Sequence, residues 1–310
     1  MIQLLELEKI SDFKLKGKMK MEAKGTSKKV IEKSEINYDY KTIKITKSRI
    51  EKGLLAIPKS FSNYLPKSNQ KIKIFLDGLN NPQIKTFSSF DSSTNENRIG
   101  GLKNWFFENQ VKEGEELVLQ ILDKERFIYR LLKEEVFLKM TKEFQTDFDI
   151  SINDKIASEK IEQISNLTQV DKTKIIFNEF LRLSKYSNEE VRKRLRTSSR
   201  FSREKTPTSI RVILENIYKG YCQVCSFSFL KRDNRPYYEI HHLEAKVGHH
   251  PKNLILVCAN CHRQFEFANV EKIPDENGWL SKVCFNQNGF FVKQAINEIE
   301  KQEFLKTVFL

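Results

Sequence analysis

The stretch 239-EIHHLEAKVGHHPKNLILVCANCH-262 contains all five histidines of the 310-residue chain and two of its five cysteines. It ends in the pair Cys258 and Cys261, and a second pair, Cys222 and Cys225 in "CQVC", lies upstream. Each Cys-x-x-Cys motif can direct two thiolates at one tetrahedral ion. We therefore expect the two pairs to form a closed structural Zn²⁺ site, and metal ligation to contribute much of the folding energy of the interval between them.

The histidines need a separate explanation, because zinc held by four thiolates has no open coordination position. The β-prone residues around "YYEIHH" predict a strand, on which His241 and His242 point to opposite faces. "NLILVC" predicts a second strand, and "EAKVGHHPK" between the two predicts a loop. "CANCHRQFEFA" predicts a helix that carries His262. The sequence thus indicates a strand–loop–strand–helix unit whose two ends are joined by one zinc site.

Two further histidines and one cysteine receive no functional role from these patterns. His249 and His250 lie in the predicted loop, and we expect them to be exposed. Cys284 in "SKVCFNQNGFF" has no cysteine partner nearby in sequence, and we expect it to be a small core residue of a strand.

The motifs "YCQVC", "EIHHLEA" and "KNLILVCANCH" resemble the HNH nuclease family, which has a ββα-metal fold. The resemblance covers about residues 208–270. It implies that His242 is the general base, that His241 and His262 hold one catalytic metal ion, and that Asn253 holds the loop that orients the base. We expect Mg²⁺ or Mn²⁺ as the catalytic ion, with magnesium as the physiological choice. A zinc module that binds DNA without cutting it is the alternative.

These roles agree with the chemistry of phosphodiester hydrolysis. An ion with two protein ligands keeps open positions for phosphate oxygens and for the leaving group. An imidazole that holds no metal titrates near neutral pH and can take a proton from water.

The charge of the chain indicates a polyanionic partner. The 54 Lys and Arg residues outnumber the 41 Asp and Glu residues, which gives a formal net charge of +13. We expect double-stranded DNA as this partner, although such an excess can also serve solubility alone. The longest apolar run, "NLILVCA", is far shorter than a membrane-spanning helix requires, and the start of the chain does not resemble a secretory signal. We therefore expect a cytoplasmic protein with no membrane partner.

Three regions differ in pattern, and together they predict an α+β multidomain fold. Residues 1–130 are rich in short strands separated by Gly- and Asn-containing turns, with a helix at "GGLKNWFFENQV", and we expect a DNA-recognition domain there. Residues 131–207 predict a helical connector, which ends in the basic linker "VRKRLRTSSRFSREK" at 191–205. Residues 208–310 contain the cysteine and histidine cluster and form the expected nuclease domain.

A second, pattern-level resemblance concerns about residues 45–125. "GLLAIP", "GGLKNWFFEN" and "VKEGEELVL" look like the DNA-binding pseudobarrel of plant auxin-response-factor proteins, which some bacterial restriction endonucleases use as a specificity domain. Candidate DNA contacts are basic or amide side chains near predicted strand ends and turns: Lys47, Arg49, Lys59, Arg98, Lys103 and Asn104.

A sequence-reading β domain joined to an HNH nuclease predicts a site-specific DNA endonuclease. The first hypothesis is a type II restriction endonuclease that acts as a homodimer, since one HNH site cuts one strand. A modification-dependent nuclease, a homing nuclease and a non-enzymatic zinc-knuckle regulator are the alternatives.

Overall fold

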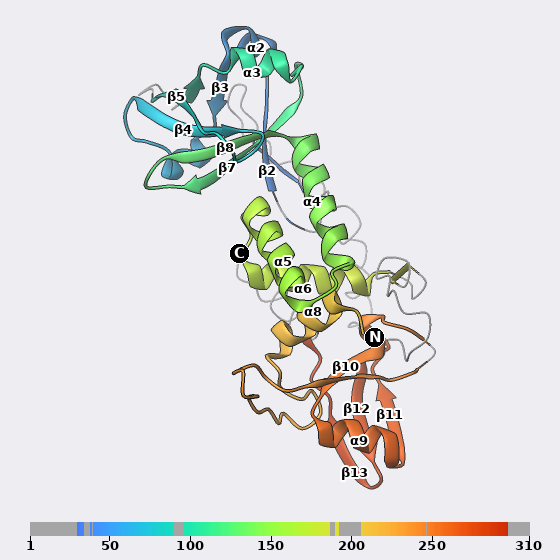
Figure 1. Cartoon of the computed structure of the whole chain (residues 1–310). Helices are drawn as coiled ribbons and strands as arrows, with labels where there is room; N and C mark the ends of the chain where they lie inside the picture. The colour runs from blue at the N-terminus through green and yellow to red at the C-terminus, as the bar shows by residue number, and fades with distance from the viewer. Residues whose placement is uncertain are drawn as a thin grey trace, which may run out of the picture. The chain divides into compact units, whose positions relative to one another are not determined.

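The computed structural model describes residues 30–33, 38, 40–89, 96–186, 190–191, 206–245 and 247–296 (Figure 1). Nearly all of the predicted basic linker and the side chain of Lys59 lie outside this description. The chain divides into two compact units, residues 1–138 and 139–310. Within the described residues, each helix is too short or too polar to cross a lipid bilayer.

The first unit is built on an eight-stranded sheet in the order β1-β2-β7-β8-β4-β5-β6-β3. All neighbouring strands pair antiparallel except β4 and β8, which are parallel. The strands are β1 (Val30–Lys33), β2 (Tyr40–Lys44), β3 (Leu54–Ile57), β4 (Gln70–Leu76), β5 (Gln83–Ser88), β6 (Asn97–Gly100), β7 (Glu116–Asp123) and β8 (Ile128–Lys133).

This sheet curls around a single apolar core, which makes the unit barrel-like. Ile43 on β2 and Leu55 on β3, near opposite ends of the strand order, belong to the same buried cluster as Ile74 on β4 and Leu131 on β8. The burial of alternate residues along β4 is the period that a strand with one buried face requires.

Three short helical segments lie between these strands: α2 (Lys47–Lys52), the 3-10 segment η1 (Lys59–Tyr64) and α3 (Lys103–Glu108). α3 is the predicted "GGLKNWFFENQV" helix, and it buries Trp105 and Phe106 in the core. α2 ends at Gly53, whose φ of +63° is favourable for glycine, and the Gly53 carbonyl accepts a hydrogen bond from Leu102 just before α3. This contact places α2 beside α3 (Figure 1).

The second unit begins with helices. α4 (Glu134–Asp149) runs through the boundary between the units, and α5 (Asp154–Thr168), α6 (Lys172–Ser184) and α8 (Thr208–Tyr218) pack on one another. Asn153 and Asp171 cap the N-termini of α5 and α6 with their side chains. Arg182 pairs with Asp149 and Glu179, all three being almost fully buried, so α4 and α6 are linked by a desolvated ion network.

The remainder of the second unit carries the cysteines and histidines. β9 (Glu239–His242) and β10 (Leu254–Val257) form an antiparallel hairpin, with the 3-10 segment η2 (Pro251–Asn253) in its loop, and α9 (Ala259–Phe267) follows. This is the predicted strand–loop–strand–helix unit. A three-stranded sheet of β11 (Val270–Pro274), β12 (Leu280–Phe285) and β13 (Asn288–Phe291) adds to its core (Figure 1).

The helices and the hairpin of the second unit are in direct contact. α6 contacts η2, and α8 contacts β10. Phe180 on α6 stacks on Trp279, just before β12, with ring centroids 5.6 Å apart. The helices therefore support the loop that carries His249 and His250.

Candidate active site and metal centre

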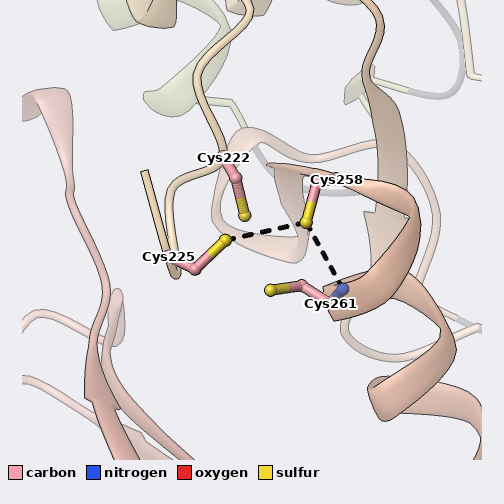
Figure 2. Close-up of side chains that lie close together, drawn as sticks. All are labelled: Cys222, Cys225, Cys258 and Cys261. Atoms are coloured by element: carbon pink, nitrogen blue, oxygen red, sulfur yellow. Dashed lines mark hydrogen bonds between the residues drawn. The ribbon is translucent and has the colours of Figure 1, made fainter. Parts of the chain in front are cut away.

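The four paired cysteines converge on one point (Figure 2). Cys222 and Cys225 lie in the turn after α8, while Cys258 caps the N-terminus of α9 and Cys261 lies in its first turn. Their Sγ atoms all lie within 4.8 Å of one another, and those of Cys225 and Cys258 are 3.6 Å apart. Tetrahedral zinc with bonds of about 2.3 Å to sulfur needs a sulfur–sulfur separation of about 3.8 Å. The cluster therefore fits a structural zinc ion.

The ionisation of these thiols supports the same conclusion. A hydrogen bond from Cys261 lowers the pKa of Cys222 to about 5, and the same contact raises the pKa of Cys261. Burial raises the pKa of Cys225. Thiols this close cannot all become thiolates unless a cation compensates their charge, so the donor set suits a divalent metal.

The side chain of Gln223, inside the first knuckle, ties the zinc site to the hairpin. Its Oε1 accepts from the backbone N–H of Leu256 on β10 at 2.7 Å, and its Nε2 donates to the carbonyl of Lys293 at 2.7 Å. The four cysteines thus join the two ends of this unit. Gln223 also fixes β10 to the segment between Cys222 and Cys225.

His241 points from β9 toward α9. Its ring stacks on Phe265 at 4.3 Å between centroids, and it lies 5.2 Å from the ring of His262. Burial lowers the pKa of His241 to about 4, and the nearby charges of His262, Lys272 and His242 add to that effect. A metal ligand must offer an unprotonated nitrogen, and this environment keeps His241 neutral.

His262 is oriented by a carboxylate that sequence reasoning did not identify. Its Nδ1 contacts Glu239 on β9, and the other oxygen of Glu239 accepts a hydrogen bond from the Tyr237 hydroxyl. A carboxylate on one ring nitrogen fixes the tautomer of a histidine and directs its second nitrogen toward a metal. The spacing Glu-x-His-His, which puts Glu239 and His241 on one face of a strand, is the signal that could have identified it.

His242 has different neighbours from His241, as expected for alternate strand positions. Its Nε2 lies 3.0 Å from Nδ1 of His249. His242 and His262 also line a cavity of about 590 Å³, whose wall includes Arg211, Lys231 and Arg235. A phosphate group in this cavity would lie beside both histidines.

Asn253 holds the loop between β9 and η2. Its Oδ1 accepts from the backbone N–H of Glu244 at 2.8 Å, and its Nδ2 donates to the carbonyls of Glu244 at 2.9 Å and of Gly248 at 2.7 Å. Three hydrogen bonds from one buried amide fix a loop that has little regular structure of its own.

The prediction that His249 and His250 are exposed was wrong, since only 2% and 9% of their surfaces are accessible. His249 faces His242, as described above. His250 caps η2, where its Nδ1 accepts from the backbone N–H of Lys252 at 3.1 Å, and it hydrogen-bonds to the backbone of Ser184 and Tyr186. The end of α6 covers this part of the loop. A contact between segments so far apart in sequence cannot be predicted from local sequence patterns.

Cys284 lies on β12, half-buried, as a strand residue apart from the four-cysteine cluster.

The N-terminal candidates separate into two groups. Lys47 on α2, and Lys103 and Asn104 on α3, are exposed on neighbouring helices. Arg49 and Arg98 are half-buried, and both pair with the carboxylate of Glu96.

Comparison with known proteins gives a family for one part of the second unit. Residues 222–266 match the family model described as HNH endonuclease. Among solved structures, the Arabidopsis FUS3-DNA complex is similar over 30% of this chain and 94% of that chain, with 11% sequence identity and a TM-score of 0.26. No curated protein sequence matches the chain. The matched residues contain the four-cysteine cluster, the β9–β10 hairpin and all of α9 except its last residue. This part of the chain is an HNH endonuclease domain, a nuclease module with a cysteine cluster suited to structural zinc.

Proposed function

We propose that the protein is a site-specific DNA endonuclease of the type II restriction class, which hydrolyses phosphodiester bonds at its HNH domain. The observation that carries the proposal is the arrangement around β9. The rings of His241 and His262 lie 5.2 Å apart between centroids. His242 and His262 line one cavity, whose wall has both basic and acidic side chains: Arg211, Lys231, Arg235, Asp154, Glu215 and Glu266. A metal-binding pair next to a separate imidazole is what a one-metal phosphodiesterase requires.

The roles follow from these positions. His242 takes a proton from the attacking water, and Asn253 keeps the loop opposite it in place. His241 and His262 would hold the divalent cation, Mg²⁺ or Mn²⁺, which when bound neutralises charge on the phosphate and on the departing 3′ oxygen. Glu239 keeps His262 oriented for that task.

Double-stranded DNA is the proposed substrate, because it supplies the polyanion that the net charge of +13 favours. One HNH site cuts one strand, so we propose that a homodimer makes the double-strand break. We also propose a cytoplasmic location, where the four thiols stay reduced.

The cleavage assay tests the proposal directly. Supercoiled plasmid incubated with the purified protein and Mg²⁺ or Mn²⁺ should become nicked and then linear, and EDTA should stop the reaction. Mapped ends at one repeated sequence support a restriction enzyme, while ends at random positions contradict site specificity. Protein that binds the plasmid and never nicks it with either metal would instead support the alternative of a non-enzymatic, DNA-binding regulator with a structural zinc site.

Matched DNA substrates separate the remaining nuclease classes. Unmethylated and methylated phage DNA should be compared side by side. Cleavage of unmethylated DNA at a short site supports the type II assignment, and cleavage restricted to methylated DNA supports a modification-dependent enzyme. A single long target site would favour a homing nuclease.

We further propose that the exposed surface of α2 and α3 contributes to DNA binding in the first unit. Replacing Lys47 and Lys103 together by alanine should weaken DNA binding uniformly across sequences. It should also lower the slope of log K against log salt by about 2, because each phosphate contact contributes about 0.9. Titrations at several salt concentrations measure the slope.

Lys71 and Lys124, which are also exposed in the first unit, provide the control with the same change of charge. An equal loss of slope in that double variant would show a general effect of net charge and would remove the specific role of α2 and α3.

A further inference from the structure

His249, which has no role in the sequence motifs, contacts the side chain of His242. His249 is 2% exposed, its Nδ1 lies 3.0 Å from Nε2 of His242, and the two rings meet at 61° with centroids 5.2 Å apart. The distance is that of a hydrogen bond between two nitrogens. His249 therefore binds the proposed general base through its side chain.

The loop holds His249 firmly at this position. The residue before it, Gly248, has a φ of +92°, and its carbonyl accepts a hydrogen bond from Asn253. The residue after it, His250, caps η2 and hydrogen-bonds to the end of α6. With both neighbours fixed, the imidazole of His249 has little freedom to leave His242, and the contact is preorganised.

We propose that His249 is a positioning residue that sets the tautomer and the direction of His242. This inference rests on the proposed nuclease function. Nε2–H of His242 donates to Nδ1 of His249, and Nδ1 of His242 is then the nitrogen that acts on water. When the water O–H bond breaks, the proton goes to Nδ1 of His242 while the oxygen forms a bond to phosphorus. The bond from phosphorus to the 3′ oxygen breaks, and that oxygen keeps the electron pair and takes a proton from solvent.

This arrangement gives His249 a role that a packing residue does not have. The imidazolium formed on His242 keeps its Nε2–H on the lone pair of His249, so the contact strengthens as positive charge develops. An interaction that is stronger in the transition state than in the ground state raises kcat and leaves substrate binding unchanged. A buried histidine that only fills space would affect folding stability instead.

The test uses the full-length protein with three substitutions. His249→Leu fills much of the space and removes the acceptor, and His249→Asn keeps an acceptor oxygen near the place of Nδ1. The matched control is Val283→Ala, which shortens a fully buried side chain on β12 of the same domain, away from the loop that carries His249. We expect His249→Leu to lower kcat on the order of 10-fold to 100-fold, with unchanged KM for DNA and unchanged zinc content. His249→Asn should keep most of kcat, and Val283→Ala should lower the thermal midpoint while kcat stays within about twofold.

A double variant separates positioning from a general disturbance of the site. On a His242→Ala background, His249→Leu should cause no further loss of residual cleavage, because the residue that it orients is absent. Wild-type kcat in folded His249→Leu, an equal loss in His249→Asn, or losses that multiply in the double variant would each overturn the inference. A wild-type protein that never cleaves DNA would overturn the proposed function instead, so the two failures are distinguishable.

A measurement on the unsubstituted protein is available if His249→Leu does not fold. Long-range ¹⁵N–¹H spectra of the histidine rings should show the proton of neutral His242 on Nε2 and an unprotonated Nδ1 on His249. A neutral His242 with its proton on Nδ1 would contradict the assignment.

Discussion

His242→Ala should abolish DNA cleavage while the protein stays folded and still binds DNA. General bases contribute about 100-fold to 10,000-fold to rate, and the loss of His242 should fall in this range. The side chain is half-buried, lines the cavity and lies outside the apolar cluster around the cysteines, so its removal leaves the zinc site intact. Plasmid nicking in Mg²⁺ or Mn²⁺ measures the rate, and a gel-shift titration in the absence of those ions measures binding.

Val283→Ala again provides the control, since it shortens a buried side chain of the same domain without touching His242. Cleavage by folded His242→Ala at the wild-type rate would show that His242 is not the general base. Loss of DNA binding in a folded variant would show that His242 acts in substrate binding instead.

Cys222→Ser is expected to release the zinc ion and to unfold most of the HNH domain. Apparent binding energies of structural zinc sites are about 10 kcal/mol or more, and this energy is available only to the folded state. Cys222 is 1% exposed and belongs to the same buried cluster as Val257 and Phe285, so the metal and the apolar core are lost together. Zinc content by elemental analysis and the thermal transition of the protein measure both effects.

The matched control is Cys284→Ser, the same chemical change on β12 outside the four-cysteine cluster. This variant should keep one zinc per chain and lose little stability. A Cys222→Ser protein that holds its zinc and melts like wild type would remove the structural role of the knuckles.

The strand–loop–strand–helix unit could be predicted from sequence because its signals are local. Cys-x-x-Cys spacing, a β-rich run on either side of a Gly- and Pro-containing loop, and a helix that begins at a capping cysteine all lie within a few residues of each other. The same holds for most strands of the first unit, which are short alternating or continuous apolar runs separated by Gly- and Asn-containing turns. β6 cannot be predicted in this way, because "NRIGG" has the composition of a turn and becomes a strand only by pairing with β3 and β5.

The remaining features depend on contacts between distant residues. His249 and His250 are buried because Asn253 shapes their loop and the end of α6, more than 60 positions earlier, covers it. The small core of the HNH domain draws Leu280, Val283 and Val292 from the C-terminal sheet, so the interval between the knuckles does not rely on metal alone. Arg49 pairs with Glu96, which is 47 positions away, and no local spacing predicts that contact.

The two tryptophans of the chain provide an optical readout for each unit. Trp105 is buried in the barrel-like core of the first unit, and Trp279 is buried against Phe180 in the second. Replacing either one by phenylalanine leaves a single emitter that reports the folding of its own unit. Metal chelation should then change the emission of Trp279 and leave that of Trp105 constant, which distinguishes local collapse of the nuclease module from denaturation of the whole molecule.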